Sequence, residues 1–151
     1  MRASNTFSIS VAWATLGPIG YLPAPGTVAT LVTMPFVYAV SSLPLVHLGV
    51  IAVLTAIGYV TTKNAQTHFK SHDPRQVVID ETIGCFITFF TISFSIKSYL
   101  IGFMLFRFFD ITKPLYIRRL EQINGPWGVL LDDAAAGVIS NLLLRTILWL
   151  I

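Results

Sequence analysis

Residues 79–90 read Ile-Asp-Glu-Thr-Ile-Gly-Cys-Phe-Ile-Thr-Phe-Phe, and they place two adjacent carboxylates at the start of a long apolar run. Asp80 lies four residues before Gly84, so the two residues share one face of a helix. A glycine on that face allows a neighbouring backbone to come close. The same spacing recurs at Asp133 and Gly137. We therefore expect two acidic helix faces that each lie against a neighbouring backbone.

Acidic residues are few in this chain and are concentrated at three places. Only seven of the 151 residues are Asp or Glu, charged residues make up 11% and hydrophobic residues 54%. An acid beside a dry apolar segment must be paired, protonated or bound to a cation. Clustered carboxylates suit a hard divalent cation such as Mg²⁺. Both acidic pairs are expected where their helices begin, and helix capping explains only one acid of each pair. The clustered acids are Asp80, Glu81, Asp110, Asp132 and Asp133.

The composition favours one membrane domain spanning residues 1–151. The net charge is +3, and the basic residues lie in short connecting segments rather than in a stripe. This pattern argues against nucleic acid as a partner and for contact with anionic lipid headgroups. Cys85 is the only cysteine, which excludes an internal disulfide. Nucleotide-binding loops and a serine, histidine and aspartate set are absent from the sequence.

Four hydrophobic stretches predict an all-α fold. The third stretch is expected to split into two helices that turn at residues 95–98, which gives five main helices after an N-terminal loop or short helix around residues 7–16. Each stretch is short or interrupted compared with the ~20 apolar residues of a typical transmembrane helix. We therefore expect a compact, membrane-embedded bundle of about five to six short helices. The four stretches are residues 28–43, 45–62, 82–109 and 134–151.

The basic residues predict the orientation of this bundle. If the chain crosses the membrane at each of the first four helices, the connectors at 63–75 and 113–119 lie on the same side as Arg2. Lys97 then lies in a turn on the opposite side. The positive-inside rule makes the shared face cytoplasmic. All three acidic clusters lie on that face, so separate segments can meet there at one end of the bundle.

Residues near the acids suggest partners for them. Asp110 is expected to close a helix, where the helix dipole disfavours an anion. Arg107 is one turn earlier on the same face and is its expected partner. Lys113 could neutralise a phosphate, or it could be an ordinary interfacial lysine. Thr27 is expected to cap the first long helix, and the backbone amides around Gly26 and Thr27 could hold an anion.

Four motifs, in order and together, resemble the phosphatidylglycerophosphatase A family. The resemblance extends from about Gly17 to Ser140, and four ordered motifs are more specific than one. It implies a helical, Mg²⁺-dependent lipid phosphatase of the bacterial inner membrane that converts phosphatidylglycerophosphate to phosphatidylglycerol and phosphate. The motifs are Pro-Ala-Pro-Gly-Thr at 23–27, Asp-Pro-x-x-Val-Val-Ile-Asp-Glu-x-x-Gly at 73–84, Phe-Arg-x-x-Asp-x-x-Lys-Pro at 106–114 and Gly-x-x-x-Asp-Asp-x-x-x-Gly at 128–137.

The resemblance also implies roles for individual residues. The family's lysine falls on Lys113, which together with Arg107, Gly26 and Thr27 is expected to bind the substrate phosphate. The chain departs from the family pattern only in loops, for example at Gly125-Pro126-Trp127-Gly128, where the family usually has Gly-Gly-x-Gly. The family's acidic motifs fall on Asp80, Glu81, Asp110, Asp132 and Asp133, which are expected to bind the metal or act as general base.

Other functions remain open at this level. A non-enzymatic carrier or channel for cations would use the same acids. Such a protein would distribute them along the depth of the bilayer, whereas the topology above places them on one face. A soluble or peripheral helical protein is a further alternative because the apolar stretches are short. The sequence leaves the oligomeric state and the division of roles among the acids open.

Overall fold

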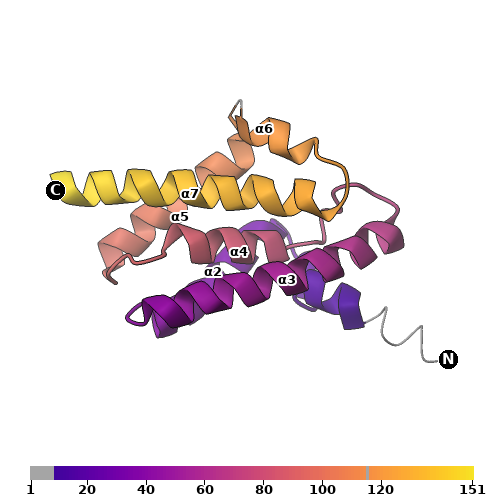
Figure 1. The fold of residues 1–151 in the computed structure, drawn as a ribbon, viewed down its shortest axis with the longest axis horizontal. Helices are drawn as coiled ribbons and strands as arrows, with labels where there is room; N and C mark the ends of the chain where they lie inside the picture. Colours follow the sequence, from indigo (N-terminus) through magenta and orange to yellow (C-terminus); the bar gives the residue numbers. More distant parts are fainter. Residues whose placement is uncertain (1–8, 115) are drawn as a thin grey trace.

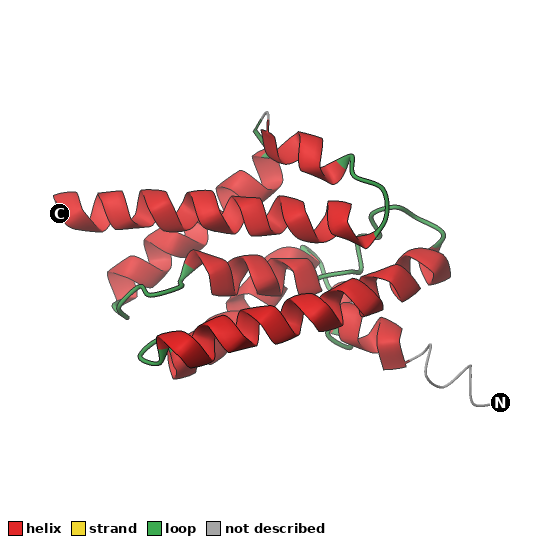
Figure 2. Ribbon diagram, in the orientation of Figure 1, coloured by secondary structure: helices red, strands yellow, loops and turns green. Residues whose placement is uncertain are grey.

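The computed structural model describes residues 9–114 and 116–151. All regular structure within these residues is helical, and they contain no strand (Figure 2). This confirms the predicted all-α fold. Of the predicted N-terminal segment at 7–16, residues 9–14 are helical, residues 15–16 form a turn, and residues 7–8 lie outside the described residues. The helices that follow are η1 (Ile19–Tyr21), α2 (Pro25–Val40), α3 (Pro44–Phe69), α4 (Ile79–Thr88), α5 (Ile96–Thr112), α6 (Tyr116–Glu121) and α7 (Pro126–Leu150).

The short helix α4 lies at the centre of the bundle (Figure 1). It packs against α2, α3, α5 and α7. Eight of its ten residues are buried, as expected for a helix that is covered on nearly all sides. Because four longer helices surround α4, residues from distant parts of the sequence meet around its acidic N-terminus.

The break within the 82–109 stretch lies at residues 89–95, earlier than the predicted turn at 95–98. Ser95 and Ser98 form a capping box, in which each side-chain oxygen accepts a hydrogen bond of 2.9 Å from the other residue's backbone N–H. This arrangement satisfies two N–H groups at the start of α5. The two serines therefore begin a helix rather than forming the turn before it.

The two acidic pairs occupy different positions in their helices. Asp80 and Glu81 lie in the first turn of α4, as predicted. Asp132 and Asp133 do not begin their helix, because α7 already starts at Pro126. Proline is favoured in the first turn, where its missing N–H costs nothing. The N-terminal dipole therefore favours negative charge on the α4 pair, but the α7 pair lies almost two turns inside its helix.

The predicted N-cap at Thr27 is wrong. Helix α2 begins at Pro25, and its N-cap is Ala24, which has a left-handed backbone conformation and makes no side-chain capping bond. Proline has a fixed φ that suits the first helical position. Thr27 consequently lies inside the first turn of α2.

Helices α4 and α7 come into close backbone contact at two glycines. A Cβ atom on Gly84 would lie 2.8 Å from the backbone oxygen of Asp133, and one on Gly137 would lie 2.6 Å from the backbone oxygen of Gly84. Both distances are too short for any other residue without movement of the backbone. The predicted close approach beside the acids is thus confirmed, and it places Asp80 and Asp133 next to each other.

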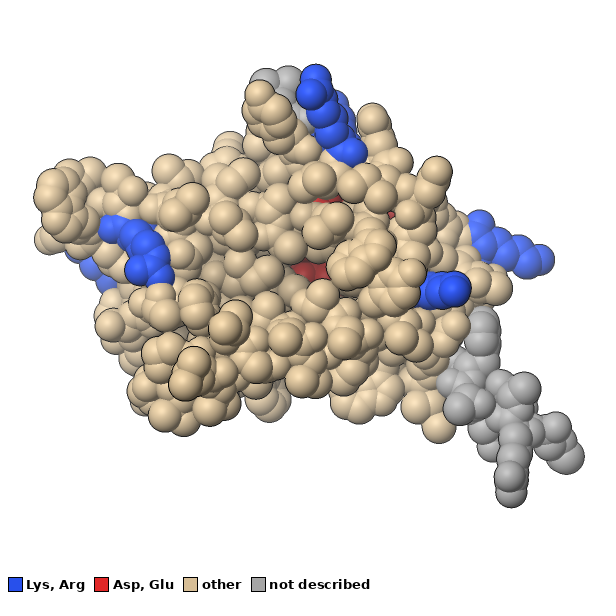
Figure 3. All heavy atoms as spheres, in the orientation of Figure 1, with Lys and Arg blue, Asp and Glu red and all other residues tan. Residues whose placement is uncertain are grey.

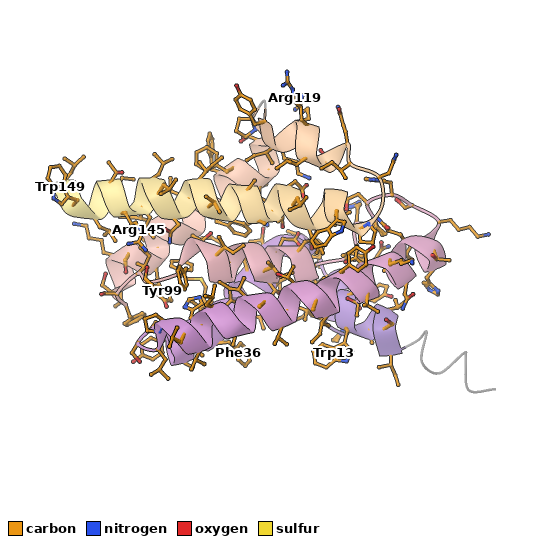
Figure 4. The ribbon with its side chains drawn as sticks, in the orientation of Figure 1. Trp13, Phe36, Tyr99, Arg119, Arg145 and Trp149 are labelled. Carbon is orange, nitrogen blue, oxygen red and sulfur yellow. The ribbon has the colours of Figure 1, made fainter. Side chains whose placement is uncertain are left out.

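Two helices within the described residues, α3 and α7, are long and apolar enough to cross a membrane. Only 22% of the most apolar segment of α3 is buried, so most of its apolar surface faces outward. Phe36 on α2 and Trp149 on α7 also point away from the fold (Figure 4). Helix α4 is about 15 Å long at the α-helical rise, roughly half the thickness of the hydrocarbon core. Its length does not support a membrane crossing at α4.

Replacement of Gly137 by alanine should lower the melting temperature of the detergent-solubilised protein, measured by circular dichroism. The added methyl group would overlap the Gly84 carbonyl and cost about 1–3 kcal/mol of stability. Gly49→Ala is the matched control, because nothing lies within 4 Å of a Cβ atom at that exposed position in α3. Alanine there should keep or raise the melting temperature. Equal melting temperatures for the two variants would contradict the close contact.

Candidate active site

A polar hollow of about 230 Å³ lies where the starts of α2 and α4, the end of α5 and the loop before α4 meet. We call it the acidic hollow. It contains four of the five predicted acids. On the face shown in Figure 3, Asp and Glu atoms are visible only as small recessed areas. Its charged lining residues are Asp73, Arg75, Asp80, Glu81, Arg107, Asp110, Lys113 and Asp133.

Three carboxylates form the centre of the acidic hollow. One oxygen atom from each of Asp80, Glu81 and Asp133 lies within 4.8 Å of those from the other two. Each residue also has a buried oxygen without a hydrogen-bond partner in the structure, namely Asp80 Oδ1, Glu81 Oε2 and Asp133 Oδ2. Unpaired buried carboxylate oxygens are costly unless a cation binds them. The geometry therefore fits a metal ion with oxygen ligands.

The electrostatics of the α4 pair support the same conclusion. Burial raises the pKa of Asp80 well above its usual value, and the charges of Glu81 and Asp133 raise it further. Burial also raises the pKa of Glu81, although the neighbouring Asp80 and Arg107 oppose the rise. The protein alone thus compensates these negative charges incompletely, and a bound cation would favour the ionised forms.

Arg107 connects α5 to the acids of α4. Its Nη1 donates a hydrogen bond to Asp110 Oδ2, which confirms the predicted partnership, and lies 4.0 Å from Glu81 Oε1. A Cβ atom on Gly26 would lie only 2.0 Å from that Glu81 oxygen, so a larger residue there would displace the Glu81 carboxylate from its present position. Gly26 lines the acidic hollow as expected, whereas Thr27 is not among its lining residues.

Lys113 is held beside the acidic hollow by two carboxylates. It ends α5 in a left-handed conformation, as the following proline favours a break in the helix. Its Nζ donates a hydrogen bond of 2.5 Å to Asp132 Oδ2 and lies 3.4 Å from Glu121 Oε1. Burial alone would lower the pKa of Lys113, but the bond and charge of Asp132 raise it above its usual value. Asp132 is thus paired with a cation and does not line the hollow.

Two charged residues of the hollow, Asp73 and Arg75, were not among the predicted site residues. Asp73 opens the same sequence motif that ends at Gly84, so its position in that motif was an available signal. Arg75 had been assigned only to the basic connector that determines orientation. The path of the loop, which brings both residues to the acids, is not encoded in any local pattern.

The structure also contains a larger cavity of about 480 Å³ between α2, α3 and α4. Its lining is almost entirely apolar, with side chains such as Phe36, Val40 and Leu54. None of the described residues that line it is charged. The smaller acidic hollow is therefore the candidate active site.

Comparison with known proteins identifies relatives of the whole chain. The family model described as phosphatidylglycerophosphatase A matches residues 12–148. A Bacteroides thetaiotaomicron protein, provisionally named a phosphatidylinositol-3-phosphatase, is 33% identical over 141 residues, which cover 87% of this chain and 89% of the relative. Proteins named phosphatidylglycerophosphatase A are also 33% identical, over 119 residues in Escherichia coli (77% of this chain, 69% of the relative) and 124 in Haemophilus influenzae (78% and 75%). No solved structure matches.

The Lys113 and Asp132 pair should contribute to stability independently of any substrate. Lys113→Met leaves the carboxylate of Asp132, which is 3% exposed, without its cation, and we expect a loss of about 3 kcal/mol. Adding Asp132→Asn should restore part of that loss, because the unpaired buried charge is removed. Thermal unfolding of the two single variants and the double variant measures this coupling. If the stability losses of the two single variants simply add in the double variant, the ion pair makes no direct contribution to stability.

Proposed function

Because this chain belongs to the phosphatidylglycerophosphatase A family and is a phosphatase, we propose that it hydrolyses phosphatidylglycerophosphate to phosphatidylglycerol and phosphate. Two relatives that bear this name support the choice of substrate. The name of the Bacteroides relative also denotes removal of a phosphate from a phospholipid headgroup. The acidic hollow, with its central group of three carboxylates, is the observation that carries the proposal.

We propose Mg²⁺ as the cofactor, held by Asp80, Glu81 and Asp133. The support is their three unpaired buried oxygens and the short separation between their carboxylates. Asp110 and Asp132 each already have a cationic partner, so we assign them to orienting the site. Bound Mg²⁺ would supply a Lewis acid for the phosphate oxygens.

The residues of the chain would then perform the remaining steps. Water attacks the phosphorus atom, the bond to the glycerol oxygen breaks, and that oxygen takes up a proton. One carboxylate of the acidic hollow accepts the proton of the attacking water. Arg107 has a buried Nε–H group without a partner, because only its Nη1 is used by Asp110 and Glu81. This donor is suited to a phosphate oxygen and to the charge that develops during hydrolysis.

We further propose that the protein is embedded in the bacterial inner membrane with the acidic hollow at the cytoplasmic face. Two helices of sufficient length and the exposed apolar side chains support the membrane assignment. A phospholipid substrate reaches such a site from the bilayer itself. A cation carrier is less compatible with the structure, because four of the five clustered acids line one hollow.

The purified protein should release phosphate from phosphatidylglycerophosphate in detergent micelles when Mg²⁺ is present. Asp133→Asn should reduce this release by at least about a hundredfold, since it removes a charged oxygen from the central group. Glu121→Gln is the matched control, because Glu121 contacts Lys113 but does not line the hollow, and it should retain most activity. Full activity of a folded Asp133→Asn protein would remove the acidic hollow from the mechanism.

Mg²⁺ should also stabilise the protein in the absence of substrate. A ligand that binds only the folded state adds about 2.7 kcal/mol when its concentration is a hundred times its dissociation constant. We expect a higher melting temperature on addition of Mg²⁺, reversal by chelator, and a much weaker response in Glu81→Gln. The Glu121→Gln variant should respond like the wild type. An unchanged melting temperature of the wild type across a full Mg²⁺ titration would contradict the proposed ligand set.

A further inference from the structure

A second polar hollow of about 250 Å³ adjoins the acidic hollow. The two share Pro25 and Arg75 in their linings, so Arg75 lies at the boundary between them. In contrast to the first, the second hollow is lined by no Asp or Glu among the described residues. Its lining residues are Gly20, Tyr21, Leu22, Pro25, Arg75 and Gln76.

The loop that carries Arg75 is fixed against the helix η1. A Cβ atom on Gly20 would lie 2.1 Å from the backbone oxygen of Gln76, so the two backbones are in direct contact. At the end of the same loop, the N–H of Val78 donates a hydrogen bond of 2.9 Å to the oxygen of Ala14. These contacts hold the backbone that directly follows Arg75, and the Arg75 side chain lies at the boundary between the two hollows.

Arg75 differs from the other two cations of the acidic hollow. Arg107 is bound by Asp110, and Lys113 is bound by Asp132 and Glu121. Arg75 is exposed and forms no ion pair with any carboxylate of the described chain, although five acids line the same hollow. Its guanidinium group is therefore available for an anion from outside the protein. A planar guanidinium suits two oxygens of a phosphate.

The proposed substrate carries two phosphates that differ in kind. One is the terminal monoester that is hydrolysed, and the other is the diester that joins the headgroup to the lipid. If the monoester lies among the central carboxylates, the glycerol between the two phosphates places the diester outside that group. The adjoining second hollow has the positive charge of Arg75 and no Asp or Glu among its described lining residues. Building on the proposed function, we infer that Arg75 and the second hollow bind the phosphodiester of the substrate. Arg75 is then a substrate-binding residue that favours headgroups with a second phosphate.

Arg75→Gln should raise the KM for phosphatidylglycerophosphate by roughly 10- to 100-fold and leave kcat within about twofold, as expected for loss of a charged hydrogen bond to bound substrate. Two inhibitors separate the two phosphate sites. Phosphatidylglycerol has the diester without the monoester, and its inhibition constant should rise by a similar factor. Inorganic phosphate mimics the monoester, and its inhibition constant should stay unchanged. Arg75→Lys should restore part of the loss.

Arg119→Gln is the control for general attraction between a basic surface and anionic lipid. Arg119 lines neither hollow and projects from α6 away from the body of the fold (Figure 4). Its kinetic constants should match those of the wild type, and all variants should melt at the wild-type temperature. An unchanged KM in Arg75→Gln would overturn the inference. An equal rise in the inhibition constants of phosphate and phosphatidylglycerol in that variant would also overturn it. Failure of the wild type to release phosphate would instead overturn the proposed function, and the inference with it.

Discussion

The backbone contact between α4 and α7 is the constraint on which the acidic hollow depends. Gly84 and Gly137 each lie one turn after a central carboxylate, and neither position has room for a Cβ atom. Larger residues would separate the two helix axes and, with them, Asp80 and Asp133. Gly26, at the start of α2, leaves room for the carboxylate of Glu81, although the contact there is with a side chain and not with backbone. Small residues at helix contacts thus determine how closely the acids approach one another.

The balance of charge around this contact is the basis for the proposed cation. Arg107 and Lys113 neutralise Asp110 and Asp132, respectively, and leave the three central carboxylates with little compensation. Without a bound cation, the negative charge of these carboxylates would repel a phosphate. Binding of the proposed divalent cation would reverse the local field and make the same place attractive to an anionic headgroup. Metal binding and substrate binding are therefore expected to be coupled.

Periodic and short-range patterns predicted much of the structure, and contacts between distant segments account for the rest. The apolar stretches predicted the main helices, and the three-residue spacing predicted the Arg107 and Asp110 pair. The loop before α4 was not predictable in this way, because long-range bonds such as that from His72 Nε2 to the oxygen of Ile123 determine its path. Asp73 and Arg75 reach the hollow only through that path. The predicted start of α7 at the acidic pair is wrong, because Pro126 fits the first helical turn better.

The position of α4 along its own axis needs a further explanation, because apolar packing alone permits sliding. The last carbonyls of a helix have no partners within it. In α4 they are bound by side chains of two surrounding helices. His47 Nε2 of α3 donates to the oxygen of Phe86 at 2.8 Å, and Asn141 Nδ2 of α7 donates to the oxygen of Thr88 at 2.8 Å. Asn141 Nδ2 also donates to the oxygen of Phe90, two residues past the end of α4, at 3.0 Å. A shift of α4 by one residue would break these buried bonds, each worth about 1 kcal/mol with a larger penalty for the unpaired groups. Polar bonds at one end of α4 therefore hold the carboxylates at its other end in place.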